Sequence, residues 1–198
     1  MIPLRAEAVW QRVMSIDERL LLSVRRWESR FMTRLMRALT HLGDPASWVV
    51  IGLALGFSGG AGAHYWALLG TAAGVALLIA QPLKRVCCRQ RPSHGIGGFA
   101  ALAENPDVFS FPSGHTAVAF AIAVAFAGQS GPLGALAMVL AIGIAISRVY
   151  LGAHYPMDVA AGVLVGTAAG GIARLLVDCF PLLKLAGYAT LAWISWIP

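Results

Sequence analysis

Three long stretches of this chain carry no charged side chain: residues 45–83, 108–147 and 159–173. A helix needs about 20 apolar residues to cross the hydrocarbon core of a bilayer, and the stretches match that requirement. Only helices and closed barrels satisfy their own backbone groups inside lipid, and no strand-like alternation occurs here. With 58% hydrophobic and 12% charged residues, the composition excludes a soluble globule, a disordered chain and a coiled coil. The sequence therefore predicts an all-α, polytopic membrane protein.

We expect a bundle of five to six transmembrane helices, with glycine-rich or small polar turns between neighbouring helices. The predicted spans are residues 44–58, 64–83, 113–130, 132–150 and 157–177, with 182–197 as a further candidate. This gives a membrane domain over 44–177, followed by a separate apolar segment over 178–198.

The N-terminal segment, residues 1–43, has a different pattern. Residues 1–37 contain eight arginines, and apolar residues recur at helical spacing between positions 10 and 35. Such an Arg-rich amphipathic helix, expected over 5–37, lies in the headgroup plane with its basic face toward anionic lipid. The alternative is a solvated helix packed on the membrane domain. No cleavable signal peptide is evident, and nucleic acid is a poor partner beside so much membrane sequence.

Reactive and cationic side chains concentrate in three clusters that adjoin the predicted spans. The clusters are Lys84–Pro92 (KRVCCRQRP), Pro112–His115 (PSGH) and Ser147–Asp158 (SRVYLGAHYPMD). A single Arg or Lys at the end of a span is usually an interface anchor, but anchoring does not explain why histidine, serine and aspartate accompany the cations in these clusters. The chain leaves the membrane near residue 84, re-enters near 113 and returns near 147. Two crossings restore the starting side, so all three clusters are expected on one face.

The clustered residues suit a multiply charged oxyanion such as phosphate. Lys84, Arg91 and Arg148 supply three cations. Ser113 is a good N-cap for the helix that follows it, which would point the Gly114 amide outward toward an anion. Gly114 has no Cβ, so an oxyanion can approach its backbone closely.

Two histidines and one carboxylate provide the groups for a transfer reaction. Pro156 suits the first position of a helix, which places Asp158 in the first turn and His154 just before it. A carboxylate there can bind one imidazole nitrogen and leave the other free to attack. His115 is then available to donate a proton to the leaving oxygen.

Zinc binding is the main alternative for a cluster of His, Cys and Asp. Cys87 and Cys88 are adjacent and not spaced as a CxxC pair, and three nearby cations would repel a metal. We therefore expect no metal ion and no other cofactor. A redox role for this vicinal pair is the less favoured interpretation, and Cys179 is interpreted as a small apolar residue.

The three clusters resemble the signature of the type 2 phosphatidic acid phosphatase (PAP2) superfamily, which also includes bacterial non-specific acid phosphatases and vanadium haloperoxidases. The family pattern is Lys, six residues, Arg-Pro; then Pro-Ser-Gly-His; then Ser-Arg, five residues, His, three residues, Asp. This chain matches every element in order, and the resemblance covers about residues 44–177. It leaves the Arg-rich segment and the last twenty residues uncovered.

The resemblance implies an integral-membrane phosphatase that releases phosphate from a lipid phosphate or diphosphate through a phosphohistidine, without a metal. It implies His154 as the nucleophile, Asp158 as the carboxylate that orients it, and His115 as the acid that later activates water. The implied phosphate ligands are Lys84, Arg91, Ser113, Gly114 and Arg148.

The sequence does not distinguish four candidate substrates: polyprenyl diphosphate, phosphatidic acid, phosphatidylglycerol phosphate and a phosphorylated glycolipid. The resemblance to short bacterial members slightly favours polyprenyl diphosphate. A lipid phosphotransferase would use the same residues, and a non-enzymatic anion or lipid transporter is a further alternative. A haloperoxidase fits the membrane setting less well.

We expect the protein in the bacterial inner (cytoplasmic) membrane with the active site facing the periplasm. Taken literally, the positive-inside rule puts the cationic face in the cytoplasm, and the eight arginines of residues 1–37 agree with it. Cations that bind phosphate are held for function, however, and the resemblance to outward-facing bacterial members favours the periplasm.

Overall fold

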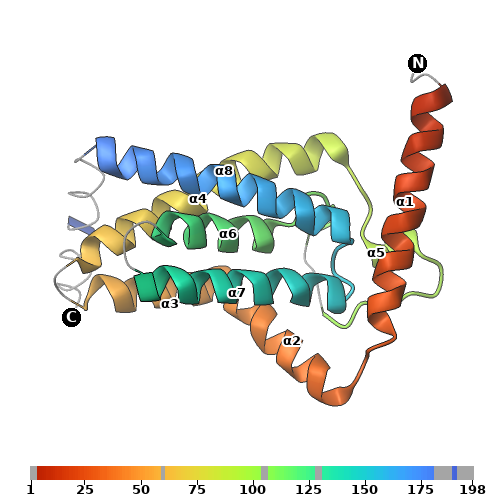
Figure 1. The fold of residues 1–198 in the computed structure, drawn as a ribbon, viewed down its shortest axis with the longest axis horizontal. Coiled ribbons are helices and arrows are strands. Elements are labelled where there is room, and N and C mark those ends of the chain that lie inside the picture. The colour runs from red at the N-terminus through yellow and green to blue at the C-terminus, as the bar shows by residue number, and fades with distance from the viewer. Residues whose placement is uncertain (1–3, 59–60, 104–106, 128–130, 181–188, 191–198) are drawn as a thin grey trace.

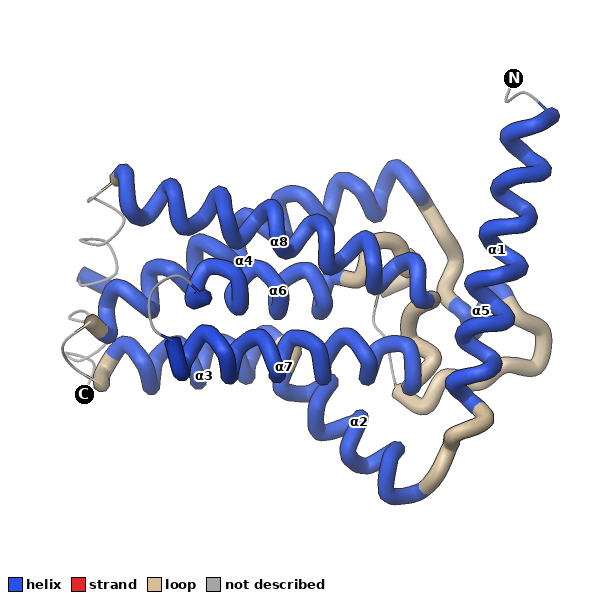
Figure 2. The backbone as a smooth tube through the Cα atoms, viewed as in Figure 1, coloured by secondary structure: helices blue, strands red, loops and turns tan. Residues whose placement is uncertain are grey.

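The computed structural model describes residues 4–58, 61–103, 107–127, 131–180 and 189–190. Its named elements are α1 (Leu4–Arg25), α2 (Arg30–Leu42), α3 (Pro45–Gly56), α4 (Gly62–Cys87), α5 (Pro92–Gly95), α6 (Gly114–Ala127), α7 (Gly131–Tyr150) and α8 (Pro156–Cys179). Within the described ranges no strand forms (Figure 2). One isolated bridge joins Gln90 and Phe109. The predicted all-α class is confirmed.

Helices α4, α6, α7 and α8 run side by side as a bundle, with α3 along α4 (Figure 1). α6 is the central helix and packs against the other three. Its sequence, GHTAVAFAIAVAFA, places small apolar residues on every side, so that neighbouring backbones can approach closely. Ala117, Ala121 and Ala125 are fully buried in this core.

A row of glycines at every fourth position of α8 sets the contact with α6. A Cβ added at Gly162 would lie 2.8 Å from the Ser113 carbonyl oxygen, and one at Gly166 would lie 2.4 Å from that of Ala117. At Gly170 the corresponding distance to the Ala121 carbonyl oxygen is 2.5 Å. The two helices therefore meet at backbone distance.

The outer surface of the bundle is apolar. Leu78, Val139, Leu164 and Leu175 expose 66–75% of their surface. In the described chain α4, α7 and α8 are long and apolar enough to cross a membrane, and α2 with α3, bent by 62°, would make a fourth span. α3 and α6 have only 12 and 14 residues. The protein is a multi-pass membrane protein, and the count of five to six spans stays a prediction.

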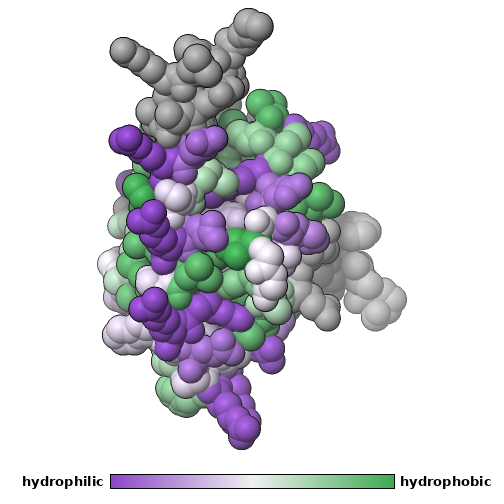
Figure 3. All heavy atoms as spheres, turned by 90° about the vertical axis from the view of Figure 1, so that its right-hand side faces the viewer, coloured by the Kyte–Doolittle hydropathy of each residue, from purple (hydrophilic) through white to green (hydrophobic). Residues whose placement is uncertain are grey.

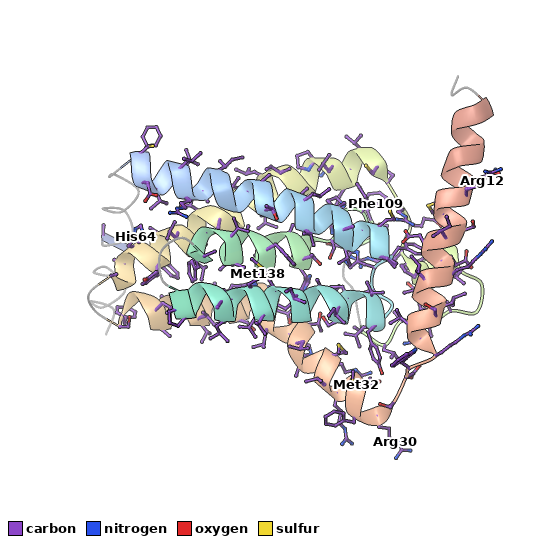
Figure 4. The ribbon with its side chains drawn as sticks, in the orientation of Figure 1. Arg12, Arg30, Met32, His64, Phe109 and Met138 are labelled. Carbon is purple, nitrogen blue, oxygen red and sulfur yellow. The ribbon has the colours of Figure 1, made fainter. Side chains whose placement is uncertain are left out.

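The amphipathic helix expected over 5–37 is two helices in the structure. The break is at Ser29, whose Oγ accepts a hydrogen bond from the Met32 amide at 3.2 Å and so begins α2. α1 crosses one end of the bundle, and α2 packs against α7 (Figure 1). Arg12 and Arg30 extend away from the bundle (Figure 4). The candidate span 182–197 lies outside the described residues, except for 189–190.

Candidate active site

The three sequence clusters meet at the end of the bundle that α1 crosses, where hydrophilic side chains gather on the surface (Figure 3). A cavity of about 1010 Å³ opens there. Its wall includes six of the eight predicted site residues: Lys84, Arg91, Gly114, His115, Arg148 and His154. The other two, Ser113 and Asp158, are completely buried behind this wall.

Lys84 and Arg91 enter the cavity from two elements. Lys84 lies in the last turn of α4, and Arg91 is the residue that precedes α5; both side chains are buried. Each is near the Asp107 carboxylate, whose Oδ2 lies 2.5 Å from Lys84 Nζ and 3.9 Å from an Arg91 nitrogen. The Lys84 hydrogen bond lowers the pKa of Asp107 and outweighs the opposing effect of burial. A carboxylate thus lies against two of the predicted phosphate-binding cations.

Arg148 lies in the last turn of α7 and is buried. Its guanidinium donates a hydrogen bond of 2.6 Å to the Thr40 hydroxyl of α2. Its carbonyl oxygen accepts the amides of Ala153 and His154 at 3.1 and 3.2 Å. The residue therefore contributes a cation and also shapes the loop that carries His154.

His154 is enclosed, with 1% of its surface exposed. Arg91 donates a hydrogen bond to the Ala153 carbonyl at 2.8 Å and lies 3.3 Å from Nε2 of His154. Burial, followed by the charges of Arg148 and Arg91, holds the pKa of His154 well below its ordinary value of 6.5. The lowered pKa favours the neutral ring, which is the form that can act as a nucleophile.

Asp158 lies in the first turn of α8, which begins with Pro156, as the sequence indicated. One carboxylate oxygen accepts the Tyr155 amide at 2.9 Å and lies 3.7 Å from His154 Nδ1. That distance is too long for a hydrogen bond, and Nδ1 has no partner among the described residues. Asp158 thus lies beside the ring without bonding to it.

Arg89 joins Asp158 to the N-terminal helix α1. Its guanidinium donates to Asp158 Oδ1 at 2.7 Å and to Asp17 Oδ2 at 2.6 Å, and lies 4.1 Å from the centre of the Tyr155 ring. The other oxygen of Asp17 accepts the Met157 amide at 2.9 Å. Asp17 is 1% exposed, so this chain of contacts attaches α1 to the start of α8.

His115 is the second residue of α6 and faces the turn between α2 and α3. Its Nε2 lies 2.9 Å from Oδ1 of Asp44. Ser113 immediately precedes the same helix; its amide donates to the Asp158 carbonyl at 2.9 Å, and its hydroxyl accepts from the Thr116 hydroxyl at 3.0 Å. The start of α6 is therefore tied directly to the start of α8.

Away from the charged residues the cavity has an apolar wall formed by α3 and α4. Trp48 and Val49 of α3 and Leu69, Ala73 and Leu77 of α4 line this part. The cavity therefore combines a cationic end that can hold a tetrahedral oxyanion with a wall that can take a hydrocarbon chain.

Four residues that contact the site residues or support them were not predicted from the sequence: Asp17, Asp44, Arg89 and Asp107. Arg89 lies inside the first cluster, so its proximity to the site was visible in the sequence. The three acids belong to no motif, and their only signal is that few acids occur in the chain, nine in total.

Comparisons with known proteins agree with this geometry. Residues 63–179 match the profile of the PAP2 superfamily. Decaprenylphosphoryl-5-phosphoribose phosphatase of Mycobacterium tuberculosis is 36% identical over 137 residues, which cover 69% of this chain and 75% of the relative. Lipid A 1-phosphatase of Rhizobium etli is 34% identical over 148 residues, covering 65% of this chain and 64% of the relative.

Two solved structures share the fold. The transmembrane PAP2 type phosphatidylglycerolphosphate phosphatase of Bacillus subtilis aligns with a TM-score of 0.71 and 25% identity, covering 85% of this chain and 88% of that one. Aquifex aeolicus LpxE aligns with a TM-score of 0.69 and 25% identity, covering 78% of this chain and 92% of that one.

Proposed function

This chain belongs to the PAP2 superfamily, and from that membership we propose that it is an integral-membrane phosphatase that hydrolyses a lipid phosphate or diphosphate without a metal ion. One observation carries the proposal: a single cavity holds both histidines, three cations and an apolar wall. A lipid phosphate has the two matching parts, an anionic group and a hydrocarbon chain.

In the first step, the Nε2 lone pair of His154 forms a bond to phosphorus while the bond from phosphorus to the lipid oxygen breaks. The electron pair of that bond stays on the oxygen, which takes a proton from His115. The products are a phosphohistidine and a lipid bearing a hydroxyl, or a lipid monophosphate when the substrate is a diphosphate. The enclosed, neutral ring of His154 supports its role as nucleophile.

In the second step, a water molecule loses a proton to His115 as its oxygen attacks phosphorus. The nitrogen–phosphorus bond breaks, its electron pair returns to His154, and phosphate is released. His115 regains the proton it gave up in the first step, so both histidines return to their starting state.

The cations act mainly on the transition state, whose charge is spread over three equatorial oxygens. Lys84, Arg91 and Arg148 surround the nucleophile. The Gly114 amide at the start of α6 is a further donor, and the hydrogen bond from the buried Ser113 amide to Asp158 holds this end of the helix in place. A Cβ added at Gly114 would lie 4.0 Å from Lys84 Nζ, so the Gly114 backbone and the Lys84 ammonium border the same part of the cavity. Loss of one such donor typically costs about 2.7–4 kcal/mol of transition-state stabilisation.

The substrate class follows from the relatives and the cavity together. Relatives are named as phosphatases of a decaprenyl-linked ribose phosphate and of lipid A, and a more distant one as an undecaprenyl-diphosphatase. These compounds share a phosphate and a long hydrocarbon part. We place polyprenyl phosphates and diphosphates first for this chain, ahead of phosphatidic acid and phosphatidylglycerol phosphate.

We further propose that the protein lies in the inner membrane of a bacterium with its site toward the periplasm. The arginines that extend from α1 and α2 would then contact anionic lipid headgroups, because both helices lie at the site end of the bundle.

The test is phosphate release by the purified full-length protein in detergent, with excess chelator, from a panel of these lipids. We expect release from at least one lipid, and an acid-labile, base-stable phosphoprotein when the substrate is labelled. His154→Ala should abolish both signals, while the distant variant Asp178→Asn keeps them. Undiminished release by His154→Ala would contradict the nucleophile assignment. Label recovered in an added lipid acceptor would identify a phosphotransferase, and lipid binding without any release would favour a transporter.

A further inference from the structure

Asp44, which lies outside the residues that match the PAP2 profile, directs both of its carboxylate oxygens at histidines. Oδ1 lies 2.9 Å from Nε2 of His115, and Oδ2 lies 2.9 Å from Nδ1 of His41. A carboxylate can only accept, so both contacts are hydrogen bonds donated by imidazole N–H groups.

The ordinary structural role of an aspartate at this position does not explain these contacts. Asp44 is the N-cap residue of α3, where an Asp side chain commonly accepts an amide of the first turn. Its side chain makes no such bond, and Pro45 follows it. The side chain is 40% exposed, and exposed ion pairs add little to stability. What the contact does fix is the orientation of an imidazole.

The turn between α2 and α3 is built to approach His115. A Cβ added at Gly43 would lie 3.2 Å from Cδ2 of His115 and 3.0 Å from Cγ2 of Ile144. Glycine therefore lets the turn come this close. The Ser47 hydroxyl donates to the His41 carbonyl at 2.6 Å and holds the two sides of the turn together.

We propose that Asp44 is the positioning residue of His115 and that His41 orients the Asp44 carboxylate. The inference rests on the proposed function. With the Nε2 proton bound to Asp44, Nδ1 is the nitrogen that exchanges a proton with the leaving oxygen and then with water. His115 begins as an imidazolium, gives its Nδ1 proton to the leaving oxygen, and keeps the Nε2 proton on the carboxylate. Burial and the positive charges of Arg148 and Lys84 disfavour the charged ring that begins and ends each cycle, and the hydrogen bond and negative charge of Asp44 oppose them.

The test compares Asp44→Asn with Asp178→Asn, the same chemical change at the far end of α8. The full-length protein is assayed with two probes. In phosphatidic acid the leaving alkoxide needs a proton. In the second probe, a nitrophenyl phosphate monoester that carries an alkyl chain on its ring, the nitrophenolate leaves without one. The quantity measured is release of the leaving group in a single turnover, which reports the first step alone. We expect Asp44→Asn to slow release from phosphatidic acid by about 10- to 100-fold and from the nitrophenyl probe by less than about threefold.

Equal losses on the two probes, or no loss on either, would overturn the proposal, because a purely structural role does not distinguish leaving groups. His41→Gln changes an exposed side chain and should give the same pattern with a smaller loss; it also serves if Asp44→Asn does not fold. An unaltered protein that releases neither leaving group would refute the proposed function and this inference with it. A protein that loses activity in His154→Ala but shows no probe-dependent effect in Asp44→Asn would refute the inference alone.

Discussion

His154 shows how the surroundings of one side chain prepare it for a single role. An exposed histidine at pH 6.5 is half protonated and, to that extent, unable to attack phosphorus. This ring is enclosed, and Lys84, Arg91 and Arg148 around it all oppose a further positive charge. The three cations that we propose as phosphate ligands therefore also favour the unprotonated form of the proposed nucleophile.

A pH profile should show this directly. Because the pKa of His154 is lowered, the fraction of neutral ring stays high as the pH falls through 6.5. We expect the single-turnover rate with the nitrophenyl probe to show no break at pH 6.5 and to fall only well below it. A titration centred at 6.5 would mean that the ring is not held neutral by its surroundings.

The residues of the site were predictable from the sequence only where a motif holds them. His115, His154 and the three cations were found because the spacing of a few residues places them at the ends of helices. Asp44 and Asp107 were missed because the predicted site residues that they contact, His115 and Lys84, are distant along the chain, and only folding brings them together. Asp17 is separated from its partner Arg89 by 72 positions in the sequence, and nothing in the neighbouring residues indicates that Asp17 is buried.

At the scale of helices, the α6–α8 contact decides the geometry of the site. His115 lies in the first turn of α6 and Asp158 in the first turn of α8, so the packing of the two helices sets the separation of these residues. Three glycines of α8 allow that packing, since a Cβ added at Gly162, Gly166 or Gly170 would lie within 3.0 Å of a backbone carbonyl oxygen at or just before α6.

Gly166→Ala should therefore be destabilising, whereas Gly171→Ala on the same helix should not. The added Cβ at Gly166 would lie 2.4 Å from a carbonyl oxygen, while at Gly171 it meets nothing within 4 Å. Such overpacking typically costs about 1–3 kcal/mol. Thermal unfolding in detergent, with phosphatase activity measured alongside, checks the prediction. Equal stability of the two variants would contradict the close contact.

The helices themselves were largely predictable, since long uncharged stretches fix their positions to within a few residues. The N-terminal segment was not, because a regular apolar period over 5–37 gives no sign of the break at Ser29. That break lets α1 cross the bundle end while α2 packs on α7, a difference that depends on tertiary contacts and not on local pattern.

At the scale of the whole molecule, the three cysteines report which side of the membrane the site faces. Cys87 and Cys88 lie at the site end of α4, and Cys179 lies at the opposite end of α8; all three are exposed. With the site toward the periplasm, a membrane-impermeant maleimide should label Cys87 and Cys88 in intact cells and Cys179 only after lysis. Cys179→Ser and the Cys87→Ser, Cys88→Ser double variant separate the two signals. The reverse pattern would place the site in the cytoplasm.

The close contact between α6 and α8 also limits where the cavity can change to accept a different lipid substrate. No room exists between those helices, so a larger or smaller substrate must be accommodated along the opposite, apolar side of the cavity. Gly70 lies on that side, and a methyl group there would meet nothing within 4 Å. Substrate preference can therefore be engineered on the apolar wall of α3 and α4 while the proposed catalytic residues at the starts of α6 and α8 are left unchanged.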